Sequence, residues 1–269
     1  MIAPHTDTVT RLIRDIVAEE VVTRFERLAH GDISEKAPGD LVTIADVQTE
    51  RRLTEALTQL LPGSVVIGEE AAAADPAVLG LLAHTAPVWV IDPVDGTWNF
   101  SEGRRHFGTM VALVRSERIE AAWIHDPLGG VTVVAEAGAG AWLGDRRLQV
   151  TKPERPEDLR GALLAGYFGD KSLGARIQSR RNRIGAVKSL RSAAHEYLRL
   201  ARGEIHYALF TKLMPWDHAP GVLIHAEAGG YARYLNGKPY RPSAVSEKGL
   251  LLASDPGSWQ RLESALFSD

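Results

Sequence analysis

Two aspartates, Asp92 and Asp95, stand at the end of an apolar run in the segment VWVIDPVDGTWNF. A short apolar run bounded by Pro and Gly is typical of a buried strand, and rigid scaffolds carry reactive side chains on the loops at strand ends. Two carboxylates three residues apart, with the carbonyl of Val94 between them, can converge on a hard cation that prefers oxygen ligands. Gly96 and Thr97 follow at an expected helix start, where backbone N–H groups bind phosphate. The segment therefore predicts a divalent-cation site beside a phosphate-binding turn.

Two other segments place acidic residues at similar junctions. In VVIGEE, the glutamates follow an apolar run, and because neighbouring side chains on a strand point to opposite faces, only one is expected at the site; Glu69 is favoured. In KLMPWDHAPGVLIHAEAGG, Asp217 precedes a helix with Pro220 in its first turn. Asp217 could instead be the N-cap of that helix, and Asp95 could cap backbone amides. Three junctions of one design favour a metal site over separate caps.

The chain resembles the inositol monophosphatase family of magnesium-dependent, lithium-sensitive phosphatases. The resemblance rests on four segments in the family's order, which are DLVTIAD, GEE, DPVDGT and WDHAPGVLIHAEAGG. A chance match to four motifs so far apart in the sequence is improbable, and together they span almost the whole chain. The resemblance implies a layered α-β-α-β-α sandwich, of the inositol monophosphatase and fructose-1,6-bisphosphatase type, with the site between its halves.

The resemblance also implies roles for individual residues. The positions that match ligands of a cluster of two or three Mg²⁺ ions are Glu69, Asp92, the carbonyl of Val94, Asp95 and Asp217. The catalytic positions are Asp46 and Thr97, a pair that orients and helps to deprotonate the attacking water, together with Glu69; Gly96 and Thr97 supply amides to the phosphate, and Lys36 lies on a usually mobile loop. Carboxylates so close together repel one another unless cations neutralise them. Metal-assisted, in-line hydrolysis without a covalent intermediate is expected.

The substrate pocket departs from the family pattern. Phe210 stands where animal inositol monophosphatases have a glutamate that binds inositol hydroxyls, although Asp95 and Asp217 also match substrate-binding positions. The segment matching the pocket wall is Arg191, Ser192 and Ala193, with Arg191 where the family usually has Gly. An arginine there would favour a second anionic group on the substrate, or would point to solvent.

Several substrates are therefore compatible with the pattern. Inositol 1-phosphate is the leading candidate, and fructose 1,6-bisphosphate, histidinol phosphate, adenosine 3′,5′-bisphosphate and NADP are alternatives. A non-catalytic regulatory member of the family is the alternative of a different class, because a fold does not fix a function. The complete set of ligand positions counts against a loss of catalysis.

Composition sets wider limits. The chain has 269 residues, a formal net charge of −3 and no cysteine. The slightly acidic balance argues against a dedicated nucleic-acid surface, and the absence of cysteine excludes disulfides. Neither an export signal nor a stretch long enough to cross a membrane is evident, so a cytoplasmic location is expected. The resemblance implies a homodimer acting on a small phosphate monoester.

Hydrophobic periodicity predicts the elements that position these residues. Helices are expected over residues 8–28 and 46–61, and an antiparallel meander over residues 109–114, 119–125, 131–136 and 141–143. The polar segment TKPERPEDL, residues 151–159, is the expected boundary. It divides an N-terminal α+β half with the metal-binding motifs, residues 1–150, from a C-terminal α/β half that completes the site, residues 151–269.

Overall fold

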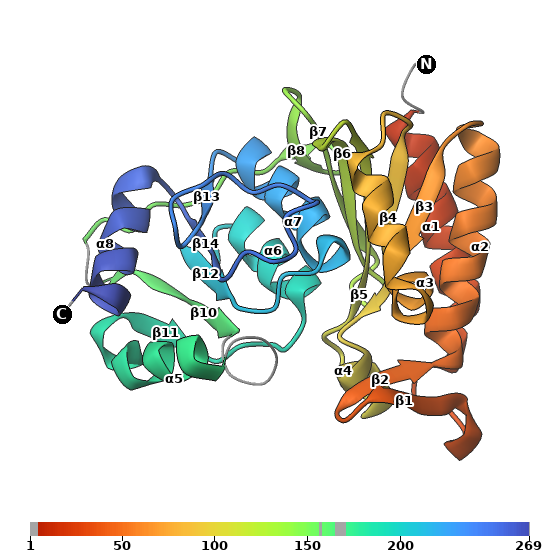
Figure 1. Cartoon of the computed structure of the whole chain (residues 1–269), viewed down its shortest axis with the longest axis horizontal. Helices are drawn as coiled ribbons and strands as arrows, with labels where there is room; N and C mark the ends of the chain where they lie inside the picture. The colour runs from red at the N-terminus through yellow and green to blue at the C-terminus, as the bar shows by residue number, and fades with distance from the viewer. Residues whose placement is uncertain (1–4, 156–157, 165–170, 269) are drawn as a thin grey trace.

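Two β-sheets and three helical layers alternate through the molecule, as Figure 1 shows. The computed structural model describes residues 5–155, 158–164 and 171–268. One outer layer consists of α1 (Thr6–Glu20) and α2 (Ile44–Leu60), and the other of α5 (Lys171–Arg180) and α8 (Pro256–Phe267). The central layer consists of α6 (Ala193–Ala201) and α7 (Pro215–Glu227). A sheet lies between each pair of helical layers, which confirms the expected α-β-α-β-α sandwich.

The larger sheet has the strand order β3-β4-β5-β6-β7-β8-β9. Its strands are β3 (Val65–Gly68), β4 (Val88–Asp95), β5 (Gly108–Arg115), β6 (Arg118–Asp126), β7 (Val131–Glu136), β8 (Gly140–Leu143) and β9 (Arg146–Arg147). β3 is parallel to β4, and every later pair of neighbours is antiparallel. The predicted meander is therefore confirmed as β5 to β8, because Gly-rich or charged turn residues separate its apolar runs.

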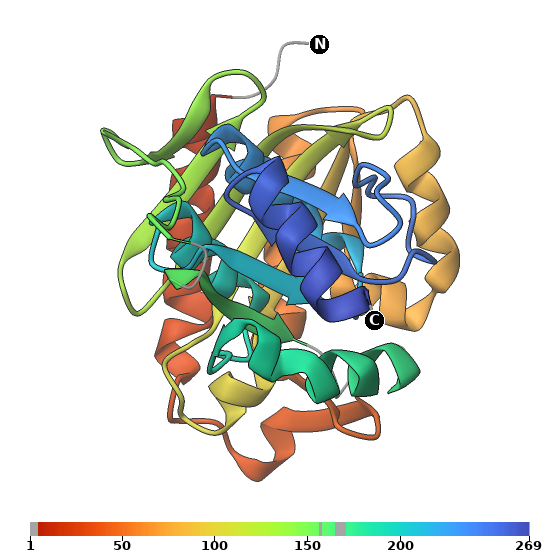
Figure 2. The same ribbon diagram turned by 90° about the vertical axis from the view of Figure 1, so that its left-hand side faces the viewer.

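The smaller sheet has the order β11-β10-β12-β14-β13. Its strands are β10 (Arg160–Leu164), β11 (Gly185–Val187), β12 (Tyr207–Phe210), β13 (Tyr231–Tyr234) and β14 (Leu250–Ala253). Figure 2 shows α8 lying across its outer face with α5 nearby. Helix α7 contacts both α6 and the strands β4 to β7 of the larger sheet. The division between residues 150 and 151 stays a prediction, and residues 156–157 of its boundary segment lie outside the described residues.

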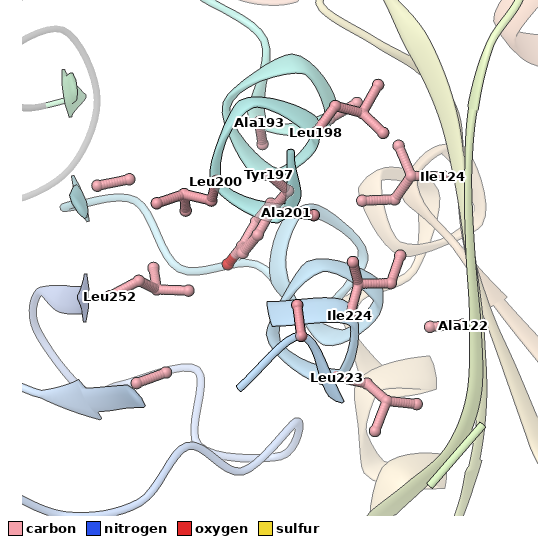
Figure 3. Close-up of a cluster of buried hydrophobic side chains, with 14 of the residues drawn as sticks. Ala122, Ile124, Ala193, Tyr197, Leu198, Leu200, Ala201, Leu223, Ile224 and Leu252 are labelled. Carbon is pink, nitrogen blue, oxygen red and sulfur yellow. The ribbon is translucent and has the colours of Figure 1, made fainter. Parts of the chain in front are cut away.

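The central helices join the two sheets through a continuous apolar core. Figure 3 shows Tyr197 and Leu198 of α6 and Ile224 of α7 between Ile124 of the larger sheet and Leu252 of the smaller one. All five side chains are at most 1% exposed. Each buried aliphatic side chain contributes about 1.5–3 kcal/mol relative to an exposed one. The position of α7 between the sheets is thus fixed by packing on both sides.

The first helix is shorter than its periodicity predicts. α1 ends at Glu20, and a 3₁₀ turn, η1 (Val22–Arg24), follows it. Phe25 then takes an extended conformation, with its ring centroid 5.1 Å from that of Phe107 and 6.0 Å from that of Phe100. This aromatic contact with the segment after β4 outweighs the helical pattern. None of the helices in the described part of the chain combines the length and apolar character needed to cross a bilayer.

Short elements complete the fold near the junction of the layers. They are β1 (Ile33–Ala37) and β2 (Asp40–Thr43), which form an antiparallel hairpin, and the helices α3 (Glu69–Ala74) and α4 (Thr97–Ser101). Figure 1 places the hairpin and α4 side by side, and α4 contacts β2. α3 directly follows β3, and α4 directly follows β4. The carboxyl ends of these two parallel strands therefore lead into the segments that the sequence marks as acidic.

Candidate metal centre

Asp92 and Asp95 lie in the C-terminal half of strand β4 and not in a loop beyond it. The pairing register with β5 shifts between the two residues, so β4 contains a bulge there. A regular strand would point residues three apart to opposite faces, and the bulge re-aims one of them. Gly96 follows with φ of 84°, and an added Cβ at this residue would lie 3.0 Å from the carbonyl oxygen of His106. Only glycine suits this turn into α4.

Helix α7 brings the third aspartate to the same place. Asp92, Asp95 and Asp217 each offer a carboxylate oxygen, and these oxygens all lie within 4.8 Å of one another. The helix begins at Pro215 with Met214 as its N-cap, so the alternative that Asp217 is the cap is wrong. Pro220 lies inside the helix and not in its first turn. Asp217 itself occupies the first turn, where the helix dipole favours a negative charge.

The cluster has the electrostatic properties of a cation site. Burial, together with the charges of Glu69 and Asp95, holds the pKa of Asp92 well above its usual value. Burial raises the pKa of Asp217 to about 7, although Lys212 opposes the shift. Oδ1 of Asp92 is buried without a hydrogen-bond partner among the described residues. Three convergent hard oxygen donors fit a divalent cation such as Mg²⁺ or Ca²⁺.

Asp95 does bond backbone amides, but they belong to α6 and not to its own turn as the capping alternative supposed, and α4 has no side-chain cap. Its carboxylate accepts hydrogen bonds from Ser192 Oγ and from the backbone N–H groups of Ala193 and Ala194, at 3.0 and 2.9 Å. Burial raises the pKa of Asp95 to about 6 although these donors oppose the shift. Ser192 is the N-cap of α6. The pocket segment is therefore bonded directly to the acidic cluster.

Glu69 and Glu70 face the same lysine, although of the two only Glu69, the favoured one, lines the pocket. Lys36 Nζ, on β1, lies 2.7 Å from Glu69 Oε1 and 2.9 Å from Glu70 Oε1. The expectation assumed a strand, but β3 ends at Gly68 and both glutamates begin α3. Glu69 lines the pocket beside the cluster without belonging to the three-carboxylate group. Burial and the charge of Glu69 raise the pKa of Glu70 to about 7.

Asp46 and Thr97 meet beside the carbonyl of Val94. Thr97 Oγ1 lies 3.2 Å from Asp46 Oδ1 and 3.0 Å from the Val94 oxygen. Asp46 is the third residue of α2, and its other oxygen accepts hydrogen bonds from the backbone N–H and the hydroxyl of Thr43, the N-cap. This capping box fixes the carboxylate. Burial raises the pKa of Asp46 to about 7.

Glu50 is a residue that the sequence analysis missed. It is 7% exposed on α2, and its carboxylate accepts hydrogen bonds from the backbone N–H groups of Glu70 and Ala71, at 2.8 and 2.9 Å. An added Cβ at Gly68 would lie 2.1 Å from its carboxyl carbon. Glu50 therefore holds the start of α3, where Glu69 stands. Its position four residues after Asp46, on the same helix face, was the available signal.

A pocket of about 420 Å³ opens onto the cluster. Besides the acids it is lined by Gly96, Thr97, Trp98, the segment from Arg191 to Ala193, Phe210 and Lys212. Lys212 is a second residue that the sequence analysis missed. A larger hollow of about 520 Å³, between α1 and the β7–β8 hairpin, contains none of the predicted site residues. The structure thus gathers the predicted metal and pocket residues around one cavity.

Known proteins share both the sequence pattern and the fold. The model of the Inositol monophosphatase family matches residues 3–268. An inositol-1-monophosphatase of Mycobacterium leprae is 32% identical over 239 residues, 87% of this chain and 80% of the relative. A Nus factor SuhB of Pseudomonas aeruginosa is 32% identical over 254 residues, 91% of this chain and 90% of the relative.

The fold comparison agrees with the sequence comparison. The crystal structure of the extragenic suppressor protein suhB from Bartonella henselae superposes with a TM-score of 0.82 at 24% identity, and covers 97% of this chain and 99% of that one. The match to the family model covers almost every residue of the chain, including all four acidic segments. The chain belongs to the inositol monophosphatase family and, like its phosphatase relatives, is a phosphoric monoester hydrolase.

Proposed function

We propose that the chain hydrolyses small phosphate monoesters with Mg²⁺ held at the cluster of Asp92, Asp95 and Asp217. The observation that supports this most directly is the convergence of the three carboxylates, each of which offers an oxygen within 4.8 Å of the other two. Glu69 and the carbonyl of Val94 would complete the donor set for two or three ions. Bound Mg²⁺ would supply Lewis-acid stabilisation of the phosphate oxygens and a lower pKa for water.

The remaining residues of the centre handle the proton and the phosphate. Asp46 is poised as the proton acceptor because burial raises its pKa to about 7, near the operating pH of a general base. The hydroxyl of Thr97 lies between Asp46 and the Val94 carbonyl and relays the proton of the attacking water. Backbone N–H groups of Gly96 and Thr97 bind phosphate oxygens, while Ser192 fixes Asp95.

The reaction is a hydrolysis in which one bond to phosphorus forms as another breaks. The water oxygen bonds to phosphorus, its proton passes through Thr97 to Asp46, and the bond from phosphorus to the ester oxygen breaks. The alcohol takes a proton from solvent as it leaves, and inorganic phosphate is the second product. No side chain of the chain is bonded to phosphorus at any stage.

Inositol 1-phosphate is the first ester to test because relatives bear the name inositol-1-monophosphatase. The pocket itself does not offer the carboxylate acceptor that inositol hydroxyls would need at residue 210, which is Phe210. The name of the SuhB relative supports a regulatory role as the second candidate. Homodimeric assembly and a cytoplasmic location stay predictions.

Phosphate release by the purified protein tests this proposal. The substrates are inositol 1-phosphate, fructose 1,6-bisphosphate, histidinol phosphate, adenosine 3′,5′-bisphosphate and NADP, each with Mg²⁺ and with chelator. Turnover of at least one ester with Mg²⁺, lost on chelation, is expected. Undiminished turnover in chelator would contradict the metal proposal, and phosphate-ester binding without any turnover would favour the regulatory role.

A further inference from the structure

Arg191 is held in an unusual backbone conformation at the rim of the pocket. Its φ is 58°, in the left-handed region that residues other than glycine rarely adopt. The surrounding structure enforces this conformation: the Asn99 side-chain amide donates to the carbonyl of Leu190 at 2.9 Å, and Ser189 Oγ accepts from the Arg191 N–H at 3.0 Å. Ser192, the next residue, is tied to the acidic cluster. The position of Arg191 relative to the cluster is therefore fixed.

The side chain of Arg191 is fixed as well. Its guanidinium carbon lies 3.8 Å from the centroid of the Trp98 ring, and that of Arg104 lies 4.5 Å from the same ring. Stacking uses the face of a guanidinium and directs its N–H donors outward in the plane, where a carboxylate or phosphate binds them bidentately. Arg191 lines the pocket and Arg104 does not. The contact with Trp98 thus holds the Arg191 guanidinium at the pocket wall in a defined position.

The pocket has a second cationic side chain. Lys212 lines it from the segment between β12 and α7. Burial lowers the pKa of Lys212, but the carboxylates around it, Asp217, Asp40, Glu69 and Asp92, together raise it above its usual value, so Lys212 keeps its charge. Asp40 also lines the pocket and offsets part of that charge. Arg191 and Lys212 are the cationic side chains in the described lining of the pocket.

Trp98 and Phe210, the aromatic residues that line the pocket in the described part of the chain, already have ring contacts. The Trp98 ring already contacts two guanidinium groups. Phe210 is 3% exposed, stacks on Tyr197 at 5.3 Å between centroids, and meets His218 edge-on at 4.8 Å. A nucleobase would need an open ring face for stacking. The described lining therefore favours an anion over a base as the second group that the pocket recognises.

We propose that the enzyme prefers phosphate monoesters whose alcohol carries a second anionic group, a carboxylate or a second phosphate, bound by the guanidinium edge of Arg191. This inference rests on the proposed function, because it takes the acidic cluster as the place of the phosphate that is hydrolysed. Lys212 adds to the potential without being the main ligand. The preference arises from Arg191 and from Trp98, whose ring holds the guanidinium in place.

Matched substrate pairs test the preference. 2-Phosphoglycerate differs from glycerol 2-phosphate only by a carboxylate in place of a hydroxymethyl group, and glucose 1,6-bisphosphate adds a phosphate to glucose 1-phosphate. We expect kcat/KM to be roughly 10-fold higher for the anionic member of at least one pair, the gain from one charge-assisted contact. The pair that responds identifies the anion as carboxylate or phosphate.

Two variants assign the effect to Arg191. Arg191→Gly removes the guanidinium and suits the left-handed backbone, so it should fold, as its melting temperature will show, and should bring the kcat/KM ratio close to one. Arg104→Gln is the matched control, because it removes a guanidinium from the same Trp98 ring outside the pocket, and it should keep the wild-type ratio. Arg191→Asn, which tolerates the same backbone conformation, should reproduce the effect of Arg191→Gly.

The outcomes separate this inference from the proposed function. The inference would be overturned if the two substrates of each pair were hydrolysed with equal kcat/KM, or if Arg191→Gly kept the wild-type preference. Either result would leave the proposed phosphatase function standing. Loss of the preference in Arg104→Gln to the same extent would also overturn it, because the effect would then be general charge. Absence of Mg²⁺-dependent turnover with every ester, including inositol 1-phosphate, would contradict the proposed function and the inference together.

Discussion

Thr97 Oγ1 lies 3.2 Å from Asp46 Oδ1, although 51 positions separate the two residues in the chain. Asp46 is anchored through its other oxygen to the N-cap of α2, and Thr97 is the first residue of α4. Two helix starts from different layers therefore meet at one hydroxyl. This contact connects a buried carboxyl group of raised pKa to the turn that follows the metal-binding aspartates.

The contact predicts a role for the Thr97 hydroxyl in turnover. Thr97→Val keeps the side-chain volume and removes the hydroxyl, so kcat should fall by roughly 10²–10⁴-fold, the usual effect of losing a proton-transfer group. Thr97→Ser keeps the hydroxyl and should retain most of the activity. Steady-state kinetics on the best ester measure both. A wild-type kcat in Thr97→Val would remove this hydroxyl from the mechanism.

Glu50 should act on the metal through the start of α3. Glu50→Gln replaces one acceptor oxygen with an amide donor that opposes the backbone N–H groups of Glu70 and Ala71. We expect Mg²⁺ affinity to fall about 10–100-fold, as when other supporting partners of metal ligands are lost. Titration calorimetry measures it. Glu55→Gln, on the exposed face of the same helix, is the control and should bind Mg²⁺ as the wild type does.

The buried carboxyl groups make metal binding and stability depend on pH. Burial raises the pKa of Asp95 to about 6 and that of Asp217 to about 7. Without metal, the folded protein binds protons that the unfolded chain has already released, so these groups stabilise it at low pH and lose that effect as pH rises through about 6–7. A divalent cation requires the deprotonated form.

The stabilisation by Mg²⁺ should therefore increase across this pH range. The measurement is the melting temperature with saturating Mg²⁺ minus that with chelator, at pH 5 to 8. Because the buried histidines His125 and His225 titrate in both samples, their contribution cancels in the difference. A difference that is constant with pH, or that decreases toward pH 8, would contradict the assignment of these carboxyl groups as metal ligands.

Residue 210 should affect the choice of substrate more than the rate of the chemical step. Phe210→Glu places an acceptor carboxylate in the pocket wall, and the kcat/KM for inositol 1-phosphate should rise relative to that for 2-phosphoglycerate. Because Phe210 is buried against Tyr197, the variant should also lose stability, by about 1–3 kcal/mol or more. Phe210→Leu controls for the lost ring and should leave the ratio near that of the wild type. An unchanged ratio in Phe210→Glu would show that this wall does not contact the alcohol.

The layered fold was predictable because motif order and apolar periodicity agree. Strands β5 to β8 match the predicted apolar runs closely, since local turn residues define their ends. The early end of α1 was not predictable in the same way. Phe25 has the spacing of a helical core residue, but its ring packs on Phe107, which lies far along the chain. Such tertiary contacts override a local pattern.

The site was predictable in composition more than in geometry. Asp92, Asp95 and Asp217 converge as their junctions suggested. The β4 bulge, which makes this possible, and the double function of Asp95 depend on backbone register and on α6. Lys36 can contact both Glu69 and Glu70 because the two glutamates begin α3 and do not end β3. One-residue shifts of an element boundary decide such contacts, and sequence patterns do not fix boundaries to one residue.

The central claim is that Asp92 holds a catalytic cation. The most direct test measures Mg²⁺ binding by calorimetry and phosphate release from the best ester, for the wild type and for Asp92→Asn, which changes charge but little volume. The wild type should bind Mg²⁺ and release phosphate only when Mg²⁺ is present, while Asp92→Asn should fold, bind Mg²⁺ more weakly and release almost no phosphate. Wild-type turnover by Asp92→Asn would contradict the account.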